Sequence, residues 1–167
     1  MTKFQKNIDV TNKKAGFEFF FLEKYTAGVV LTGTEVKSIR MNKFNMGDAY
    51  CFFQDGELIL KNLNISKYEH GTYLNHEPLR DRKLLLKRKE LRKLENKLTD
   101  KGLTIIPTRL YINEGGFIKI DIALAKGKKL YDKRDSIKEK DVMRERQRAS
   151  IDLLDLRLKS NRSLKNQ

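Results

Sequence analysis

Hydrophobic side chains recur in short runs through residues 17–66, and turn-forming residues separate the runs. Phe, Val, Ile and Leu fill the runs, while Gly, Asn and Asp stand between them. This pattern of short apolar runs and turn residues predicts successive β-strands. The predicted strands are FEFFF at 17–21, GVVLTG at 28–33, EVKSIR at 35–40, AYCFF at 49–53 and ELILKNLNI at 57–65.

The clearest turn in this region is the sequence Gln54-Asp55-Gly56-Glu57. An Asp-Gly pair between two apolar runs favours a two-residue hairpin turn, because both residues readily adopt the positive φ that the turn needs. We therefore expect a tight hairpin between Cys51–Phe53 and Leu58–Leu60.

A helical periodicity follows Pro78. One helical segment is predicted, opened by Pro78 and ending before Gly102, because leucines recur there at the spacing of a helix face. Over Arg80–Lys101, ten Lys or Arg accompany four acids, which gives a net charge of +6. A charged helix face is most often simply solvated, and an RNA-facing side is the alternative that the charge of the whole chain favours. The leucines at helix spacing are Leu84, Leu91, Leu94 and Leu98.

Strand character returns after this helix. Leu103–Asn113 and Phe117–Ala125 are two apolar runs, and Glu114-Gly115-Gly116 forms a turn between them. In the second run apolar and charged residues alternate, which predicts a strand with one buried face. The predicted fold class is therefore mainly β: a small antiparallel OB-like barrel of six or seven strands with one main inserted helix. Closure into a barrel would remove the exposed edges of such short strands.

The sequence after Ala125 predicts a basic C-terminal tail. Through Arg148 it holds ten basic and five acidic residues and has little apolar content to pack. Ser136 and Glu139 have capping-box spacing, so a helix is encoded from about Ile137, but a charged helix without a packing partner is marginal in water. We expect this tail to fold on a partner. The predicted domains are an N-terminal arm at 1–11, an OB-like barrel at 12–125 and the tail at 126–167.

The charge of the chain points to a polyanionic partner. Lys and Arg number 36 against 22 Asp and Glu, so the net charge is +14 and the isoelectric point about 9.8. Nucleic acid is the first candidate, and an anionic membrane surface is the second. No apolar stretch is long enough to span a bilayer, and Met1–Val10 lacks the apolar core of a signal peptide, so we expect a cytoplasmic protein without membrane binding.

Three stretches carry the functional signal. The first runs from Asn12-Lys13-Lys14-Ala15 through AGVVL at 27–31 to GTEVKSIR at 33–40. The second is His76-Glu77-Pro78 followed by RDRKLLL at 80–86, and the third is LAKGKKLYDKR at 124–134. Together, in this order and spacing, they resemble the small protein B (SmpB) family, also called the SsrA-binding proteins, over roughly residues 12–148. Lys87 departs from the family pattern, which commonly has His at that position.

The resemblance implies an adaptor rather than an enzyme. Members of this family have an OB-like barrel that grips the tRNA-like domain of tmRNA and, with elongation factor Tu, escorts it into stalled ribosomes for trans-translation. Their tail enters the decoding centre and the empty mRNA channel, where it becomes helical against small-subunit rRNA. The resemblance thus implies tmRNA, the stalled ribosome and elongation factor Tu as partners, and we expect a monomer without a cofactor.

The resemblance also implies candidates for the tmRNA face. Lys and Arg neutralise phosphates, while Asn, Ser and a carboxylate can bond base edges or ribose hydroxyls. Glu35 has two interpretations: it orients Lys37 or Arg40 in a surface ion pair, or it accepts hydrogen bonds from the RNA itself. The candidates are Asn12, Lys13, Lys14, Glu35, Lys37, Ser38 and Arg40.

At the tail root, the resemblance implies contacts with small-subunit rRNA. The lysines suit phosphates, and Gly127 allows the backbone to approach RNA closely. Tyr131 offers a ring for stacking on a base, although it could equally be an ordinary amphipathic residue that ends the last strand. The ribosome-facing candidates are Lys126, Gly127, Lys128, Lys129, Tyr131, Asp132, Lys133, Arg134, Ile137 and Lys138.

Catalysis has little support in the sequence. His70 and His76 lack a third metal ligand nearby, and the glycine-rich and nucleophile motifs of hydrolases and nucleotide enzymes are absent. We therefore expect no catalytic residue and no metal site. Cys51 is the single cysteine and is expected to be a small buried hydrophobe rather than a reactive thiol. The alternative functions are a general single-stranded nucleic-acid or ribosomal protein, and an RNA-processing nuclease.

Overall fold

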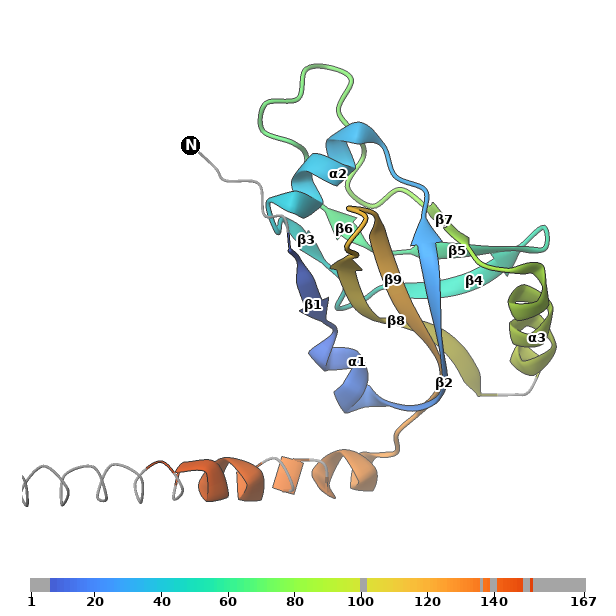
Figure 1. Ribbon diagram of the computed structural model, residues 1–167. Helices are drawn as coiled ribbons and strands as arrows, with labels where there is room; N and C mark the ends of the chain where they lie inside the picture. Colours follow the sequence, from blue (N-terminus) through green and yellow to red (C-terminus); the bar gives the residue numbers. More distant parts are fainter. Residues whose placement is uncertain (1–6, 100–101, 136, 139–140, 149–150, 152–167) are drawn as a thin grey trace, which may run out of the picture. The chain divides into compact units, whose positions relative to one another are not determined.

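The computed structural model describes residues 7–99, 102–135, 137–138, 141–148 and 151 (Figure 1). Contacts divide the chain into two compact units, Met1–Gly127 and Lys128–Gln167. The first unit holds the strands, and the described residues of the second are mostly helical.

The first unit is an antiparallel barrel. Neighbouring strands follow the order β1-β8-β4-β5-β7-β2-β9, and β9 also pairs with β8, so the sheet closes on itself. This arrangement confirms the predicted mainly β, OB-like fold. The strands are β1 (Asp9–Thr11), β2 (Phe19–Val29), β4 (Tyr50–Gln54), β5 (Glu57–Lys61), β7 (Arg82–Leu85), β8 (Leu103–Ile112) and β9 (Ile118–Gly127), and the short strands β3 (Phe44–Asn45) and β6 (Asn64–Ile65) form a separate pair.

The hairpin between β4 and β5 forms at the predicted turn. Asp55 and Gly56 have φ of 53° and 75°, as a turn with two left-handed residues requires. Gln54 pairs with Glu57, and Cys51 pairs with Leu60. Cys51 is 4% exposed, so it packs as a core residue as predicted.

The second hairpin joins β8 and β9. Its turn closes where Asn113 Oδ1 accepts a hydrogen bond from the Phe117 N–H over 2.8 Å, and Gly116 has a φ of 78°. The hairpin was predicted, but β9 continues two residues past Ala125, through Lys126 and Gly127. Two helices in the first unit were not predicted: α1 (Lys13–Glu18) and α2 (Gly33–Arg40).

The prediction of a strand at 35–40 is wrong, because this segment is the helix α2. Val36 and Ile39 stand three residues apart, and Ile39 is buried in the core. The Glu35 carboxylate accepts a hydrogen bond from the Thr32 N–H over 2.8 Å, which caps the first turn. Likewise Phe17 and Glu18 of the predicted first strand belong to α1.

The helix predicted from Pro78 is also partly wrong. The segment 82–85 is the strand β7, in which Arg82 and Leu84 are buried while Lys83 and Leu85 are exposed. That period of two is a strand pattern. The helix α3 covers only Arg88–Leu98, and it packs Leu94 into the core while most of its cations face solvent.

The second unit begins its helix earlier than predicted. Leu130–Asp135 is helical, and so are residues 137–138 and 141–148. The Asp132 carboxylate accepts a hydrogen bond from the Lys129 N–H over 3.0 Å, and Lys133 N–H bonds to the Lys129 carbonyl over 3.1 Å. Tyr131 therefore lies in the first turn of a helix and does not end a strand. The predicted capping pair Ser136 and Glu139 lies outside the described residues.

Candidate nucleic-acid interface

Glu35 is buried at the start of α2 and binds two arginines. Its Oε1 accepts hydrogen bonds from Arg80 Nε over 2.7 Å and from Arg82 Nε over 2.8 Å. Burial alone would raise the pKa of this carboxyl, but the Arg80 hydrogen bond, the Thr32 N–H and both positive charges hold the pKa below its usual value. The expected surface ion pair with Lys37 or Arg40 is therefore wrong: Glu35 pairs with Arg80 and Arg82.

Asn12 and Ser38 are also interior side chains. Asn12 is 6% exposed, and its Oδ1 accepts from the Ala15 N–H, so it caps α1. The Asn12 Nδ2 donates to the carbonyls of Met46 and Pro107, each over 3.0 Å. Ser38 Oγ is buried and makes no hydrogen bond with the described residues. The structure thus gives Asn12 an intramolecular, positioning role.

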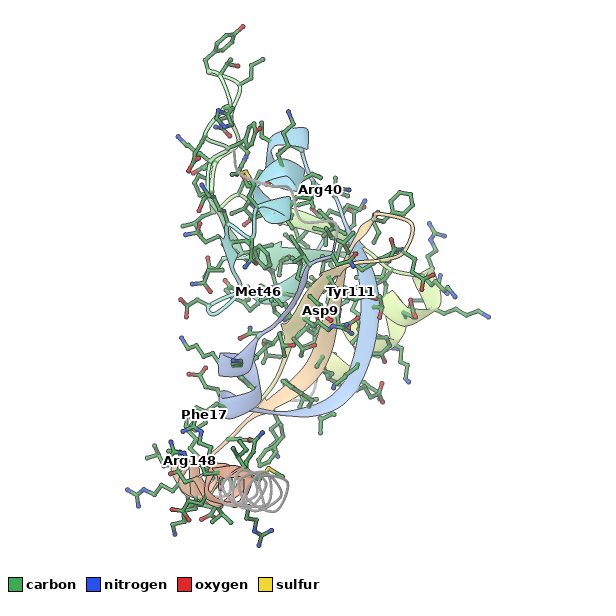
Figure 2. All side chains as sticks on the ribbon, turned by 60° about the vertical axis from the view of Figure 1, so that its left-hand side comes forward. Asp9, Phe17, Arg40, Met46, Tyr111 and Arg148 are labelled. Carbon is green, nitrogen blue, oxygen red and sulfur yellow. The ribbon has the colours of Figure 1, made fainter. Side chains whose placement is uncertain are left out.

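The other four tmRNA-face candidates reach the surface in two groups. On α1, Lys13 is exposed and Lys14 Nζ pairs with Asp48 over 2.6 Å. On α2, Lys37 Nζ lies 5.1 Å from the centre of the Tyr68 ring. Arg40, labelled in Figure 2, donates to the Gly116 carbonyl in the β8–β9 turn over 3.2 Å. The structure brings Lys37 and Arg40 together on one helix beside that turn.

A groove that the sequence patterns did not predict lies next to α2. One depression, of about 290 Å³, runs between Val36, Phe117 and Gly28. A second depression, of about 590 Å³, shares Gly28, Leu85 and Lys119 with the first and extends to Lys24 and Lys87. We call these two adjoining depressions together the Gly28 groove. Its lining residues are Lys24, Tyr25, Thr26, Gly28, Val29, Leu31, Val36, Leu85, Leu86, Lys87, Glu90, Gly116, Phe117, Ile118 and Lys119.

Strand register brings the centre of the groove together. Gly28 on β2 pairs with Leu85 on β7 and with Lys119 on β9. A Cβ at Gly28 would lie 3.4 Å from the Leu85 Cβ, so the missing side chain keeps the floor low. Leu85 is 52% exposed because it lies on the solvent side of β7 with Lys83. A leucine at a solvent-facing position of the strand was the signal in the sequence that could have indicated this groove.

The groove has the chemistry of an RNA-binding surface. Its floor is apolar, the Phe117 ring at one end is 68% exposed, and Lys24, Lys87 and Lys119 are distributed along it. An exposed ring can stack on a base, while the lysines can neutralise phosphates. This combination suits an unpaired or folded RNA better than a small apolar ligand.

The tail-root candidates fall on both units. Lys126 and Gly127 end β9, where they pair with Phe20 and Phe19, and both are exposed. In the second unit, Lys129 is exposed, and the Tyr131 side chain is 60% exposed. The remaining candidates are Lys128, Asp132 and Lys133, which are half-buried, and Arg134, Ile137 and Lys138, which are exposed.

The histidines take no part in a metal site among the described residues. His76 is buried, and its ring nitrogens lie 3.0 Å from the Ile65 carbonyl and 2.9 Å from Thr34 Oγ1. No group of three or more His, Cys, Asp or Glu in the described part of the chain is placed to hold a metal. Within the same ranges, no helix is long and apolar enough to cross a membrane.

Comparison with known proteins decides the family. The family model described as SmpB protein matches residues 9–152, which is most of the chain. This chain belongs to the SmpB family. The match contains both the barrel and the described part of the tail, so membership of the SmpB family covers every candidate residue discussed above.

Proteins named SsrA-binding protein are similar to this chain over most of its length. The SsrA-binding protein of Cytophaga hutchinsonii is 60% identical over 146 residues, which cover 87% of this chain and 95% of that protein. The SsrA-binding protein of Gloeobacter violaceus is 49% identical, over 86% of this chain and 94% of that one. A solved structure described as "tmRNA-SmpB: a journey to the center of the bacterial ribosome" is 47% identical with a TM-score of 0.62, covering 73% of this chain and 85% of that chain.

Proposed function

We propose that this protein is an RNA-binding adaptor that binds the tRNA-like domain of tmRNA and delivers it to stalled ribosomes for trans-translation. The observation that carries this proposal is membership of the SmpB family over residues 9–152, together with close relatives named SsrA-binding protein. The solved neighbour, described as a tmRNA-SmpB assembly of the bacterial ribosome, supports the same partners. Elongation factor Tu takes part in delivery, and the protein acts as a cytoplasmic monomer without catalysis.

The barrel unit binds the tmRNA in this proposal. The Gly28 groove supplies an apolar floor and three lysines, and α2 adds Lys37 and Arg40 beside it. On α1, Lys13 and Lys14 provide further cations. Glu35, Ser38 and Asn12 are interior residues, and Glu35 and Asn12 hold α2 and α1 in place rather than reach the RNA. Binding by phosphate neutralisation makes the affinity strongly dependent on salt.

The tail acts on the ribosome. Its described residues are mostly helical and exposed, with Lys129 just before the helix and Tyr131 and Arg134 on its first turns. In the stalled ribosome this basic helix probes the decoding centre and the empty mRNA channel, where cations meet rRNA phosphates and Tyr131 stacks on a base. The tail-root residues from Lys126 to Lys138 that the sequence singled out make these contacts.

A gel-shift titration against the tRNA-like domain, with tRNA as competitor, tests the proposal. We expect specific binding that weakens steeply as salt rises and that excess tRNA displaces poorly. Binding no tighter than to an unrelated RNA hairpin at equal salt would reject the adaptor function and favour a general nucleic-acid protein. Metal-dependent cleavage of the labelled RNA would instead indicate a nuclease.

Truncation separates the two units. A chain that ends at Gly127 keeps all of β9, so the barrel stays closed. It should bind the tRNA-like domain with much of the full-length affinity but fail to support peptide tagging on stalled ribosomes. A general single-strand binder would lose affinity without this selective loss of tagging.

A further inference from the structure

The segment between β6 and β7 forms a loop that projects beyond α2 (Figure 1). We call the residues that flank the tip of this loop, Lys67–Tyr68 and Asn75–His76, its neck. Asn75 joins the two sides of the neck: Asn75 Oδ1 accepts from the Tyr68 N–H over 3.2 Å, and Asn75 Nδ2 donates to the Tyr68 carbonyl over 2.8 Å. A Cβ at Gly71 would lie 2.6 Å from Asn75 Nδ2, so only glycine leaves room for this brace. The hydrogen bonds of Asn75 therefore hold the neck of the loop in one conformation.

The neck is also fastened to α2 and to β6. His76 Nδ1 lies 2.9 Å from Thr34 Oγ1 on α2, and His76 Nε2 lies 3.0 Å from the Ile65 carbonyl on β6. The Lys37 ammonium lies 5.1 Å from the centre of the Tyr68 ring. These contacts tie the loop to the helix whose other residues border the Gly28 groove.

The tip of this braced loop presents two apolar side chains to solvent. Tyr73 is 93% exposed and Leu74 is 75% exposed. Tyr73 has the largest exposed fraction among the large hydrophobic side chains of the described residues. A bare aromatic ring on a fixed neck is free to stack on a nucleobase without first being rearranged.

We propose that Tyr73 stacks on an unpaired nucleobase of the tRNA-like domain of tmRNA, at a contact separate from the Gly28 groove. The inference rests on the proposed function. Lys37, which lies against the Tyr68 ring, and the exposed Lys67, which precedes Tyr68 in the chain, supply positive charge near the neck for the phosphates that would flank such a base. Val36 lines the groove while Lys37, the next residue, covers Tyr68, so α2 links the two contacts. Aromatic rings tolerate any base, because every base has a face to stack on.

Three variants at position 73 test this inference. The chain contains no Trp, so Tyr73→Trp gives a single tryptophan that can be excited selectively, and a stacked base should quench its emission during titration with a transcript of the tRNA-like domain. Tyr73→Ala should raise the Kd for this transcript about tenfold, within the range for one stacked base. Tyr73→Phe keeps the ring and should bind like the wild type. Tyr50→Ala, at a partly exposed tyrosine on β4, serves as the matched control.

The outcomes separate the inference from the proposed function. Equal losses in Tyr73→Ala and Tyr73→Phe would assign the contact to the hydroxyl group and overturn stacking. Unchanged RNA affinity of Tyr73→Ala would also overturn it, and a tagging defect in that variant would then place the tip against a ribosomal component. Failure of the wild-type protein to bind the transcript would instead remove the proposed function. Melting temperatures of all variants should be measured as a check on folding, and the exposure of Tyr73 predicts that those of its variants match the wild type.

Discussion

Glu35 and Arg82 form an ion pair in which both side chains are fully buried, with Arg82 Nε donating to Glu35 Oε1 over 2.8 Å. Arg82 also donates to the carbonyls of Leu63 and Pro78 over 2.6 Å and 3.1 Å. The pair thus joins α2 to β7, to the residue before β6 and to the end of the projecting loop at Pro78. Removal of one member leaves the other charge buried without its partner, which costs about 3–5 kcal/mol.

We therefore expect Glu35→Ala to lower the free energy of unfolding by about 3 kcal/mol or more in urea denaturation. The control is Glu57→Ala, which removes the exposed partner of Lys83 and should cost less than about 1 kcal/mol. Similar losses of unfolding free energy in the two variants would show that the buried ion pair stabilises the fold no more than an exposed one does.

Glu23 should make stability depend on acid pH. Hydrogen bonds from Lys97, Tyr25 and Lys93 lower the pKa of Glu23 to about 2, from 4.5. Because the folded pKa lies below the unfolded one, the stabilisation is present above pH 4.5 and is lost as the pH falls toward 2. The melting temperature of Glu23→Gln should thus lie below that of the wild type at pH 7, with the gap closing near pH 2. A gap that stays constant with pH would contradict the role of this charge.

Lys119 should contribute a phosphate contact in the Gly28 groove. Lys119→Ala is expected to weaken binding to the tRNA-like domain several-fold and to reduce the slope of log K against log salt by about one. The matched control is Lys61→Ala on β5, a lysine outside the groove, which should leave the slope unchanged. A slope that changes equally in both variants would place the RNA elsewhere on the barrel.

The first turn of the tail helix should matter on the ribosome and not for the free RNA. Tyr131→Ala combined with Asp132→Ala removes an exposed ring and the carboxylate that accepts from the Lys129 N–H. We expect unchanged affinity for the tRNA-like domain and a clear loss of peptide tagging on stalled ribosomes. Asp135→Ala, in the same helix, is the control. A drop in RNA affinity with tagging per bound complex intact would refute this division of roles.

Cys51 should resist modification in the folded protein. Burial raises the pKa of its thiol well above the ordinary value, and its side chain packs in the core of the barrel. A thiol reagent at pH 8 should therefore react with Cys51 only after denaturation, because the thiolate is the reactive form. Rapid reaction of the native protein, followed by mass spectrometry, would contradict the burial.

Short-range patterns predicted those elements whose causes are local. The Asp55-Gly56 turn and the β8–β9 hairpin follow from turn chemistry and from alternation within one run. The segment at 35–40 was misassigned because it is short, although Thr32 and Glu35 have capping-box spacing. Val36 and Ile39, three residues apart, share one face of a helix but would lie on opposite faces of a strand, so their spacing was a further signal for the helix.

The features that the sequence did not predict depend on contacts between residues far apart in the chain. Arg82 is buried in β7 because Glu35, 47 positions away in the chain, neutralises it, and no pattern within RKLLL reveals that partner. The Gly28 groove depends on the register that joins Gly28 to Leu85 and Lys119, three residues from distant strands. Likewise Glu35 and Asn12 look like surface polar residues in sequence, and only the packed structure shows that they are interior.

The strand that closes the barrel is also the strand that leads into the tail. The last residues of β9 are bonded on both sides, since Lys126 pairs with Phe20 on β2 and with Leu103 on β8. A pull along β9 would have to shear two hydrogen-bonded ladders at once rather than peel one residue after another. Tension applied to the tail is therefore resisted by both neighbouring strands of the barrel, so the junction between barrel and tail is mechanically strong.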